Sequence, residues 1–279
     1  MSIILKGIVF LVVILVVHRV YRYFVDLKKW DKPVMKLAGT RDQVIIYSAY
    51  DLKYSKRPFV EKNSEIIRKY AEVNGHVYKQ IIDGSISPYW IRVKALLDIL
   101  NTTSDNTLVV YFDADAIPVH SDVSVTEFIA SLNAPTFDIF ISEDPSLELS
   151  PVYPGLYNTG VFIVRNTQRS RDFVNKWMDK YDDKKWKELD GKWSCVDTMV
   201  PCIWAGSNYE QGAFIDLTKE HGDGLVKGLK STTLACNKVD DSCFAIHLMG
   251  ESDSIRDTTF SQVLQPTQTK KVIFSGLNV

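Results

Sequence analysis

Short apolar runs alternate with amphipathic, helix-like stretches from residue 44 onward, and no other feature limits the possible folds as strongly. The apolar runs lie at 44–50, 76–82, 108–112, 138–142 and 160–165. Between them, apolar residues recur at helical spacing at 58–74, 88–100, 124–132 and 169–180. Strands that alternate with helices predict an α/β fold, with a mostly parallel central sheet covered by helices on both faces.

The composition is that of a globular protein and argues against a nucleic-acid partner. The 279 residues are 46% hydrophobic and 24% charged, and 33 Lys and Arg residues balance 34 Asp and Glu residues. A protein that binds a polyanion would carry a basic surplus. The length suits one large domain. We predict three parts: an anchor at 1–25, a stem or linker at 26–42, and the α/β domain at 43–279.

The N-terminal segment, residues 3–25, differs in kind from the rest of the chain. Residues 8–17 are uninterrupted apolar sequence. A helix that spans a bilayer needs about 20 residues, a length reached if the flanking Lys6 and Arg19 extend to the interface. No small-residue cleavage site follows, as it would in a secretory signal. We therefore predict a single-pass membrane protein anchored through residues 3–25; the alternative is a buried core helix.

Evidence on the cellular compartment points in two directions. The basic residues that follow the apolar segment favour the cytosolic face for the bulk of the chain. The sequon Asn101-Thr102-Thr103 favours the lumen instead. The four cysteines suit either two disulfide bridges or small buried side chains, and none has the spacing of a zinc site.

Two carboxylates, Asp113 and Asp115, directly follow the apolar run 108–112. Mutual repulsion and desolvation both oppose such a placement, so a cation is expected between them. In α/β sheets, ligands bind beyond the carboxyl ends of the strands. Two carboxylates at this position suit a hard divalent cation that keeps open positions for phosphate oxygens. The same pattern also fits a haloacid-dehalogenase-type phosphatase with Asp113 as nucleophile, although that motif normally follows the first strand of its domain.

Four stretches, in order, resemble the family that contains yeast α-galactosyl- and mannosyltransferases and plant xyloglucan xylosyltransferases. They are "PYWIRVKALLDIL" (88–100), "VVYFDADAIP" (109–118), "YNTGVFIVRNTQRSRDFVNKW" (157–177) and "FAIHLMG" (244–250). The resemblance implies a Rossmann-like GT-A fold, a UDP-sugar as co-substrate, and Mn²⁺, with Mg²⁺ as the alternative ion. It also implies a location in the Golgi or ER lumen.

The resemblance also implies roles for individual residues. Asp113, Asp115 and His247 would bind the metal, although His247 by itself equally suits a core position. Asp197 would be catalytic, because "VDT" stands where the family has an Asp-Gln pair; by itself it suits a helix N-terminus. Further contacts to the donor are expected from Ser48, Ala49, Tyr50, Arg92, Ala114, Asn158, Thr159, Gly160 and Gly250.

The structural expectations for these donor contacts are specific. Tyr50 would stack on the nucleotide base, and Asn158-Thr159-Gly160, which by itself reads as a turn, would lie beside the sugar. Two departures from the family affect the donor site. Arg92 stands where lysine is usual, and the basic residue after the late His-x-x-Gly is absent, Arg256 being the nearest.

Together these features predict a membrane-anchored, metal-dependent glycosyltransferase. It would move xylose or galactose from a UDP-sugar to a glycan or glycoprotein acceptor, with retention of configuration. Two alternatives remain open from the residues alone: the phosphatase, and a non-catalytic, sugar-binding membrane protein.

Overall fold

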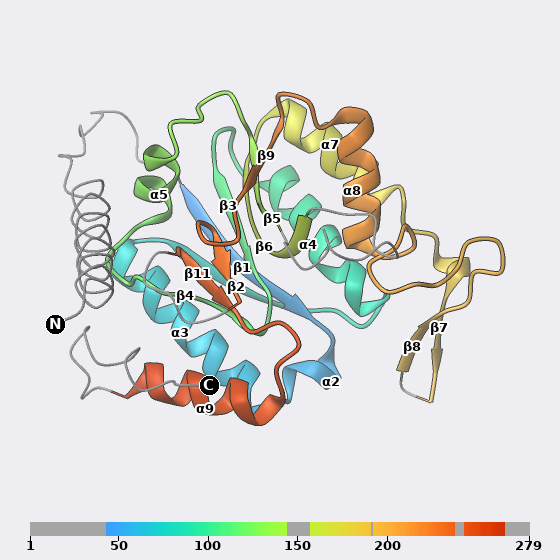
Figure 1. Ribbon diagram of the computed structural model, residues 1–279, viewed down its shortest axis with the longest axis horizontal. Helices are drawn as coiled ribbons and strands as arrows, with labels where there is room; N and C mark the ends of the chain where they lie inside the picture. The colour runs from blue at the N-terminus through green and yellow to red at the C-terminus, as the bar shows by residue number, and fades with distance from the viewer. Residues whose placement is uncertain (1–42, 144–156, 191, 238–242, 266–279) are drawn as a thin grey trace, which may run out of the picture. The chain divides into compact units, whose positions relative to one another are not determined.

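A six-stranded mixed sheet forms the centre of the α/β unit (Figure 1). In the computed structural model, the described residues are 43–143, 157–190, 192–237 and 243–265. The strand order is β2-β1-β3-β6-β5-β9. These strands are β1 (Val44–Tyr50), β2 (Val77–Ile82), β3 (Leu108–Phe112), β5 (Ile139–Glu143), β6 (Tyr157–Arg165) and β9 (Val226–Leu229).

β6 is the reversed strand in the described six-stranded sheet, whose other strands run in one direction, as a mostly parallel sheet requires. β1 runs parallel to β2 and β3, and β5 runs parallel to β9, but β6 is antiparallel to both of its neighbours, β3 and β5. Neighbouring antiparallel strands need no helical crossover between them. The sequence between β5 and β6, residues 144–156, contains three prolines and no helical periodicity. β6 also begins at Tyr157, so Asn158 to Gly160 lie in a strand and not in the turn that these residue types alone would suggest.

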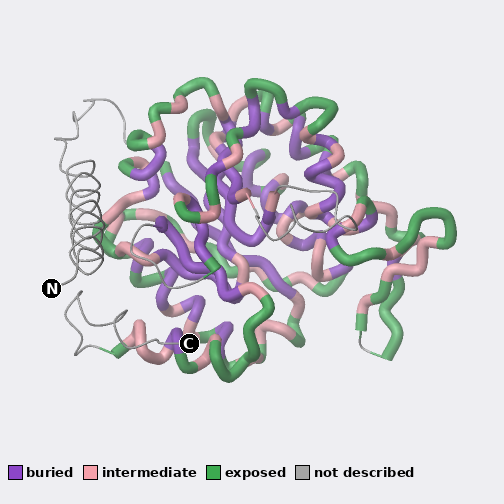
Figure 2. The backbone as a smooth tube through the Cα atoms, viewed as in Figure 1, coloured by how far each residue is buried: buried purple, intermediate pink, exposed green. Residues whose placement is uncertain are grey.

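Helices cover both faces of the sheet because alternate strand residues point to opposite sides. Val109 and Tyr111 of β3 belong to one apolar cluster, and Val110 and Phe112 to another. The first cluster includes α4 (Pro88–Thr102), α7 (Gln168–Met178) and α8 (Glu210–His221); the second includes α3 (Pro58–Asn74) and α5 (Val125–Ser131). Figure 2 shows the central strands buried along their length. This is the three-layer arrangement that the strand–helix alternation predicts.

A second, three-stranded sheet crosses the end of β3 and positions the late part of the chain. Its order is β10-β11-β4, formed by Ala235–Cys236, Ala245–His247 and Ala116–Pro118. β11 is antiparallel to β4, and its register places His247 opposite Ala116. A residue near the end of the domain is thereby brought to the turn that carries the two aspartates.

The remaining elements lie at the rim of the unit. α2 (Leu52–Ser55) follows β1, and α9 (Asp253–Leu264) packs on α3 through the ion pair of Lys62 and Asp257, at 2.7 Å. The 3-10 helix η1 (Asp183–Lys185) leads into the hairpin of β7 (Trp186–Leu189) and β8 (Lys192–Cys195). All four cysteines form disulfides, Cys195–Cys202 and Cys236–Cys243.

The prediction of a single-pass membrane protein requires correction. Across the residues that the structure describes, no helix combines the length and the apolar character needed to cross a bilayer. α3, for example, has 17 residues and carries exposed charged side chains on one face. The segments predicted as anchor and stem, residues 1–25 and 26–42, lie outside the described residues.

Candidate functional site

The two aspartates sit in a tight turn between β3 and β4 that several elements hold in place. The Asp113 amide donates to the Gly160 carbonyl of β6 at 2.8 Å, and the Ala116 amide donates to the Asp113 carbonyl at 2.9 Å. From α3, the buried Asn63 side chain donates to the Ala116 carbonyl at 2.6 Å. The carboxylates therefore project from a fixed backbone at the end of a central strand, not from a solvated loop.

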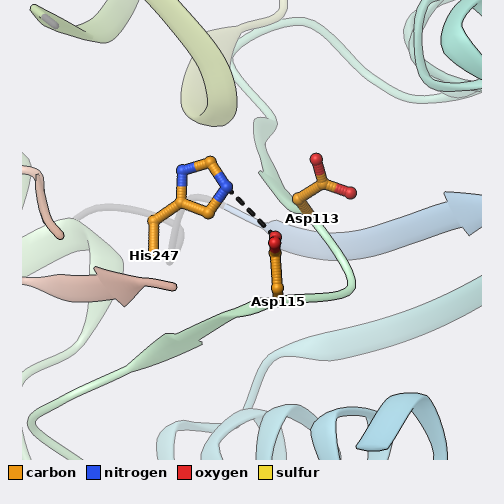
Figure 3. Close-up of side chains that lie close together, drawn as sticks. All are labelled: Asp113, Asp115 and His247. Atoms are coloured by element: carbon orange, nitrogen blue, oxygen red, sulfur yellow. Dashed lines mark ion pairs between the residues drawn. The ribbon is translucent and has the colours of Figure 1, made fainter. Parts of the chain in front are cut away.

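Asp113, Asp115 and His247 converge on one point (Figure 3). Each offers one ligand atom, and these atoms lie within 4.8 Å of one another. His247 Nε2 is 3.1 Å from Asp115 Oδ1. The Leu248 amide donates to the Asp115 carbonyl at 2.9 Å and so ties the end of β11 to the turn. The structure thus brings together the three residues predicted as metal ligands.

Charges within this cluster are balanced by neighbouring cations. Arg256 Nη2 of α9 is 2.7 Å from Asp115 Oδ2. Burial alone would raise the pKa of Asp115, but His247, and then Arg256 and Arg92, hold that pKa below its ordinary value. Burial alone would lower the pKa of His247, but Asp115 and Asp113 raise it. Asp115 is therefore ionised at neutral pH, as a metal ligand must be.

Arg92 of α4 joins the cluster to the interior of the domain. Its Nη2 is 3.0 Å from Asp113 Oδ2, and its Nη1 donates to the Thr159 carbonyl at 3.2 Å and lies 3.6 Å from Glu210 Oε1. The guanidinium also lies over the Tyr111 ring, 4.9 Å from its centroid. Burial opposes the charge on Arg92, but Asp113, Tyr111 and Glu210 outweigh it and raise its pKa. Arg92 is a permanent buried cation beside the aspartates.

The chemistry and the space of this cluster fit a divalent cation. Two carboxylates and one imidazole are acceptable ligands for Mn²⁺, and the imidazole is a poorer ligand for Mg²⁺. Gly160 leaves the room that the imidazole needs, since a Cβ there would lie 2.0 Å from His247 Cε1. Both carboxylates also accept hydrogen bonds or ion pairs from Arg92 and Arg256, which orient them.

The predicted donor residues of β1 do not lie as expected. Ser48 is fully buried, and Ala49 is 4% exposed. The ring of Tyr50 is also 4% exposed, and its hydroxyl is hydrogen-bonded to Ser64 Oγ at 2.9 Å and to Gln80 Nε2 at 2.6 Å. We therefore correct the expectation that Tyr50 stacks on a nucleotide base. Its side chain, like those of Ser48 and Ala49 at this end of β1, is packed in the core.

The residues predicted from the second, third and fourth motifs gather near the cluster. The Ala114 amide donates to Asp113 Oδ1 at 2.9 Å, and the Gly160 amide donates to Asn158 Oδ1 at 2.8 Å. Thr159 Oγ1 donates to Glu210 Oε1 at 3.2 Å. Gly250 follows β11 with φ of 73°, a backbone conformation that favours glycine.

Asp197 lies in a different environment from the one predicted. Its carboxylate accepts hydrogen bonds from the amides of Met199 and Val200, at 2.8 and 3.1 Å, and pairs with Lys185 Nζ at 2.9 Å. Lys185 and these two amides lower its pKa. Among the described residues, nothing links the Asp197 side chain to Asp113, Asp115 or His247. The structure therefore does not join Asp197 to the cluster, and its carboxylate caps a loop.

Glu210 and Gln211, which the sequence analysis missed, are the acid–amide pair that the structure places at the site. They begin α8, and both side chains accept from Thr159: Glu210 from its hydroxyl, and Gln211 Oε1 from its amide at 3.1 Å. Burial raises the pKa of Glu210, although Arg92 opposes this. The signal that the sequence offers is an acid followed directly by an amide in "NYEQGAF".

Tyr54 of α2 is another residue near the aspartates that the sequence motifs did not predict. Burial, together with the nearby Asp113 and Asp115, raises its pKa, so its phenol lies within electrostatic range of both aspartates. Its ring packs on Phe59 and under the Arg57 guanidinium, 4.4 Å from the centroid. Unlike Tyr50, it is only partly buried.

A small cavity of about 20 Å³ adjoins the cluster on the side of β5. It is lined by Glu143, Asn158 and His247 among others. A larger one, of about 220 Å³, lies between β2 and α4 and includes Lys79, Asp83 and Lys94, but none of the residues of the cluster. The smaller cavity is therefore the one relevant to the candidate site.

This combination defines a GT-A-like glycosyltransferase: a mixed α/β sheet, an acidic pair at the end of a central strand, and a histidine delivered by a second sheet. The chain belongs to the nucleotide-diphospho-sugar transferase family, whose model matches residues 83–267. The protein is thus an enzyme, and the phosphatase and non-catalytic alternatives are set aside. No curated protein sequence matches the chain.

A solved structure supports this fold. A glycosyltransferase involved in glycosylation of the major capsid of PBCV-1 is similar over 78% of this chain and 98% of its own, with 16% identity and a TM-score of 0.55. The galactosyltransferase LgtC, in complex with donor and acceptor sugar analogues, covers 81% and 98% at 14% identity and a TM-score of 0.43. Mouse xyloside xylosyltransferase 1 covers 69% and 87% at 11% identity and a TM-score of 0.39. The first similarity bears on the fold alone, and the other two are too distant for argument.

Proposed function

We propose that the protein transfers a monosaccharide, xylose or galactose, from a UDP-sugar to a glycan acceptor, with Mn²⁺ held by Asp113, Asp115 and His247. The observation that carries this proposal is the convergence of these three side chains at the end of β3. The four sequence motifs support a place among the yeast α-galactosyl- and mannosyltransferases and plant xylosyltransferases. We assign the transferase domain to residues 43–279, preceded by a linker at 26–42.

A bound divalent cation would supply Lewis-acid stabilisation of the charge on the departing diphosphate. The chain's own cations add to this. Arg256, already 2.7 Å from Asp115, is placed to contact a phosphate oxygen and thus to replace the basic residue that the motif lacks. Gly250 lets the backbone approach the diphosphate. Tyr54, near both aspartates and partly exposed, takes the base-stacking role first expected of Tyr50.

Glu210 and Gln211 replace Asp197 as the groups beside the reacting sugar. Through Thr159 and Arg92 they are fixed next to Asp113. Glu210 is buried and pairs with Arg92, so its carboxylate is not available as a general base. An inverting reaction requires a carboxylate base at the acceptor. We propose retention, as the sequence resemblance implies: the bond from the sugar to the diphosphate breaks, the acceptor oxygen bonds to the same face, and its proton passes to the leaving phosphate oxygen.

The test is a donor screen with purified protein. UDP-xylose, UDP-galactose and UDP-glucose are incubated with Mn²⁺, with and without a panel of disaccharide acceptors, and UDP release is measured. We expect slow hydrolysis of one preferred donor and faster release with an acceptor. Absence of UDP binding and of donor turnover with every sugar would refute the proposed donor site.

A further inference from the structure

The loop between β8 and α8 presents an aromatic ring to solvent. Trp204 is 57% exposed, which is unusual for so large an apolar side chain. Within the described residues, no hydrogen bond occupies its indole N–H. Exposed apolar surface of this kind, when it is contiguous with other apolar groups, commonly marks a binding site.

The Trp204 ring is fixed in place by other aromatic rings. It makes edge-to-face contacts with Tyr89 of α4 and with Tyr209, at centroid distances of 5.2 and 5.3 Å. These two tyrosines contact each other at 4.9 Å, and both contact Trp186 of β7, at 5.5 and 5.1 Å. Trp186 is 4% exposed, and the two tyrosines are half-buried. The cluster thus has a buried base and one exposed face, that of Trp204.

The backbone that carries Trp204 is equally constrained. Gly212 of α8 packs directly against it: a Cβ at this position would lie 2.2 Å from the Gly206 carbonyl carbon. Ala205 adopts a positive φ of 58°, and the Gly206 amide donates to the Ile203 carbonyl at 2.9 Å. The Cys195–Cys202 disulfide closes the start of the same loop. A ring held in this way loses little conformational entropy when a ligand binds it.

The aromatic cluster adjoins the candidate active site through the chain itself. Tyr209, in contact with Trp204, directly precedes Glu210. Glu210 in turn contacts Thr159 and Arg92, and Arg92 pairs with Asp113. The exposed ring is therefore linked to the acid–amide pair through Tyr209, which it contacts and which directly precedes Glu210.

We propose that Trp204 forms the wall of the acceptor subsite and stacks its indole on the apolar face of a saccharide ring. This proposal rests on the proposed function and extends it by naming the residue that holds the acceptor. A pyranose offers a face of C–H groups and a rim of hydroxyls, so it matches an exposed aromatic face with a free N–H at its edge. Fixing the acceptor beside the donor sugar would also lower the entropic cost of the transfer.

The test uses saturation-transfer NMR on the full chain with UDP, Mn²⁺ and four disaccharide probes: lactose, maltose, cellobiose and xylobiose. We expect transfer to the ring C–H protons of at least one probe. Trp204→Ala should weaken binding of that probe about tenfold, whereas Trp204→Phe should retain most of it because the stacking face remains. Met199→Ala is the matched control, since Met199 is an apolar side chain that is 88% exposed on the same loop. Thermal melts show that the variants are folded.

Each outcome is decisive. The stacking assignment is overturned if saturation transfer to the probe survives Trp204→Ala, or if Met199→Ala reduces it equally. It is also overturned if protein that binds UDP with Mn²⁺ shows no saturation transfer to any of the four probes. Failure of the wild-type protein to bind UDP instead refutes the proposed donor site, so the two failures are distinguishable. Sedimentation that shows a dimer lost in Trp204→Ala, with probe binding unchanged, would assign the ring to a contact between two copies of the chain.

Discussion

The imidazole of His247 packs against the Cα of Gly160, in the space where any other residue would carry its β carbon. A Cβ at position 160 would lie 2.0 Å from Cε1 and 2.6 Å from Nδ1 of the ring. Nε2 of the same ring is 3.1 Å from Asp115 Oδ1. β6 and the turn after β3 therefore fix the imidazole between them, although His247 comes from β11. The absence of a side chain at Gly160 therefore allows the His247 imidazole to lie beside the two aspartates.

Gly160→Ala should displace the His247 ring and lower the affinity for UDP in the presence of Mn²⁺ by at least about tenfold, a typical effect of disturbing the surroundings of a metal ligand. Calorimetric titration measures it. Gly84→Ala is the control, because no atom lies within 4 Å of a Cβ there and its φ is not positive. Equal affinities of the Gly160 variant and the wild type would show that His247 does not bind the metal.

Arg256→Gln should weaken UDP binding about tenfold, because a charged donor to a phosphate oxygen is lost. Lys62→Gln is the matched control: Lys62 pairs with Asp257 of the same helix α9 at 2.7 Å but contacts neither aspartate of the turn. Titration with UDP at constant Mn²⁺ compares the two. A smaller loss for Arg256→Gln than for Lys62→Gln would assign Arg256 a purely structural role.

Arg92→Ala should lower the free energy of unfolding by about 3–5 kcal/mol, because it leaves the buried Glu210 and the partly buried Asp113 without their shared cation. Lys69→Ala removes the exposed pair of Lys69 and Glu65 one turn apart on α3, and should cost no more than about 0.5 kcal/mol. Urea denaturation without added metal measures both. Similar losses for the two variants would contradict the buried network described above.

Asp197→Asn should destabilise the protein at neutral pH but not in strong acid. Lys185 and two backbone amides hold the folded pKa of Asp197 below its ordinary value. A carboxylate with a depressed pKa contributes stability above its unfolded pKa of about 3.9, and this contribution is lost as the pH falls toward the folded value. Melting temperatures of wild type and variant, measured from pH 7 to 2, should therefore differ by a constant amount above about pH 4 and by progressively less as the pH falls further. A constant difference across this range would mean that Asp197 acts through packing and not through its charge.

Local patterns in the sequence were sufficient to predict the elements that carry the site. The run 108–112 is apolar throughout, and the charges that interrupt it at Asp113 and Asp115 mark the end of β3. The ends of helix α3 follow from Pro58 and Gly75, whose backbone preferences act within a few residues. Each of these signals depends only on neighbouring residues, so a single sequence contains it.

The resemblance predicted the meeting of His247 with the aspartates, and only the tertiary structure shows how it is made. The direction of β6, the packing of Glu210 on Arg92, the pairing of Arg256 with Asp115 and the burial of Tyr50 could not be read from the residues. The position of Asp197 in a motif predicts a catalytic role. In the structure its carboxylate instead pairs with Lys185 and accepts hydrogen bonds from two backbone amides of its own loop. The physical reason is the same in each case. Periodicity and capping are local properties of the chain, whereas strand order and the partner of a buried charge are set by contacts between residues far apart in sequence.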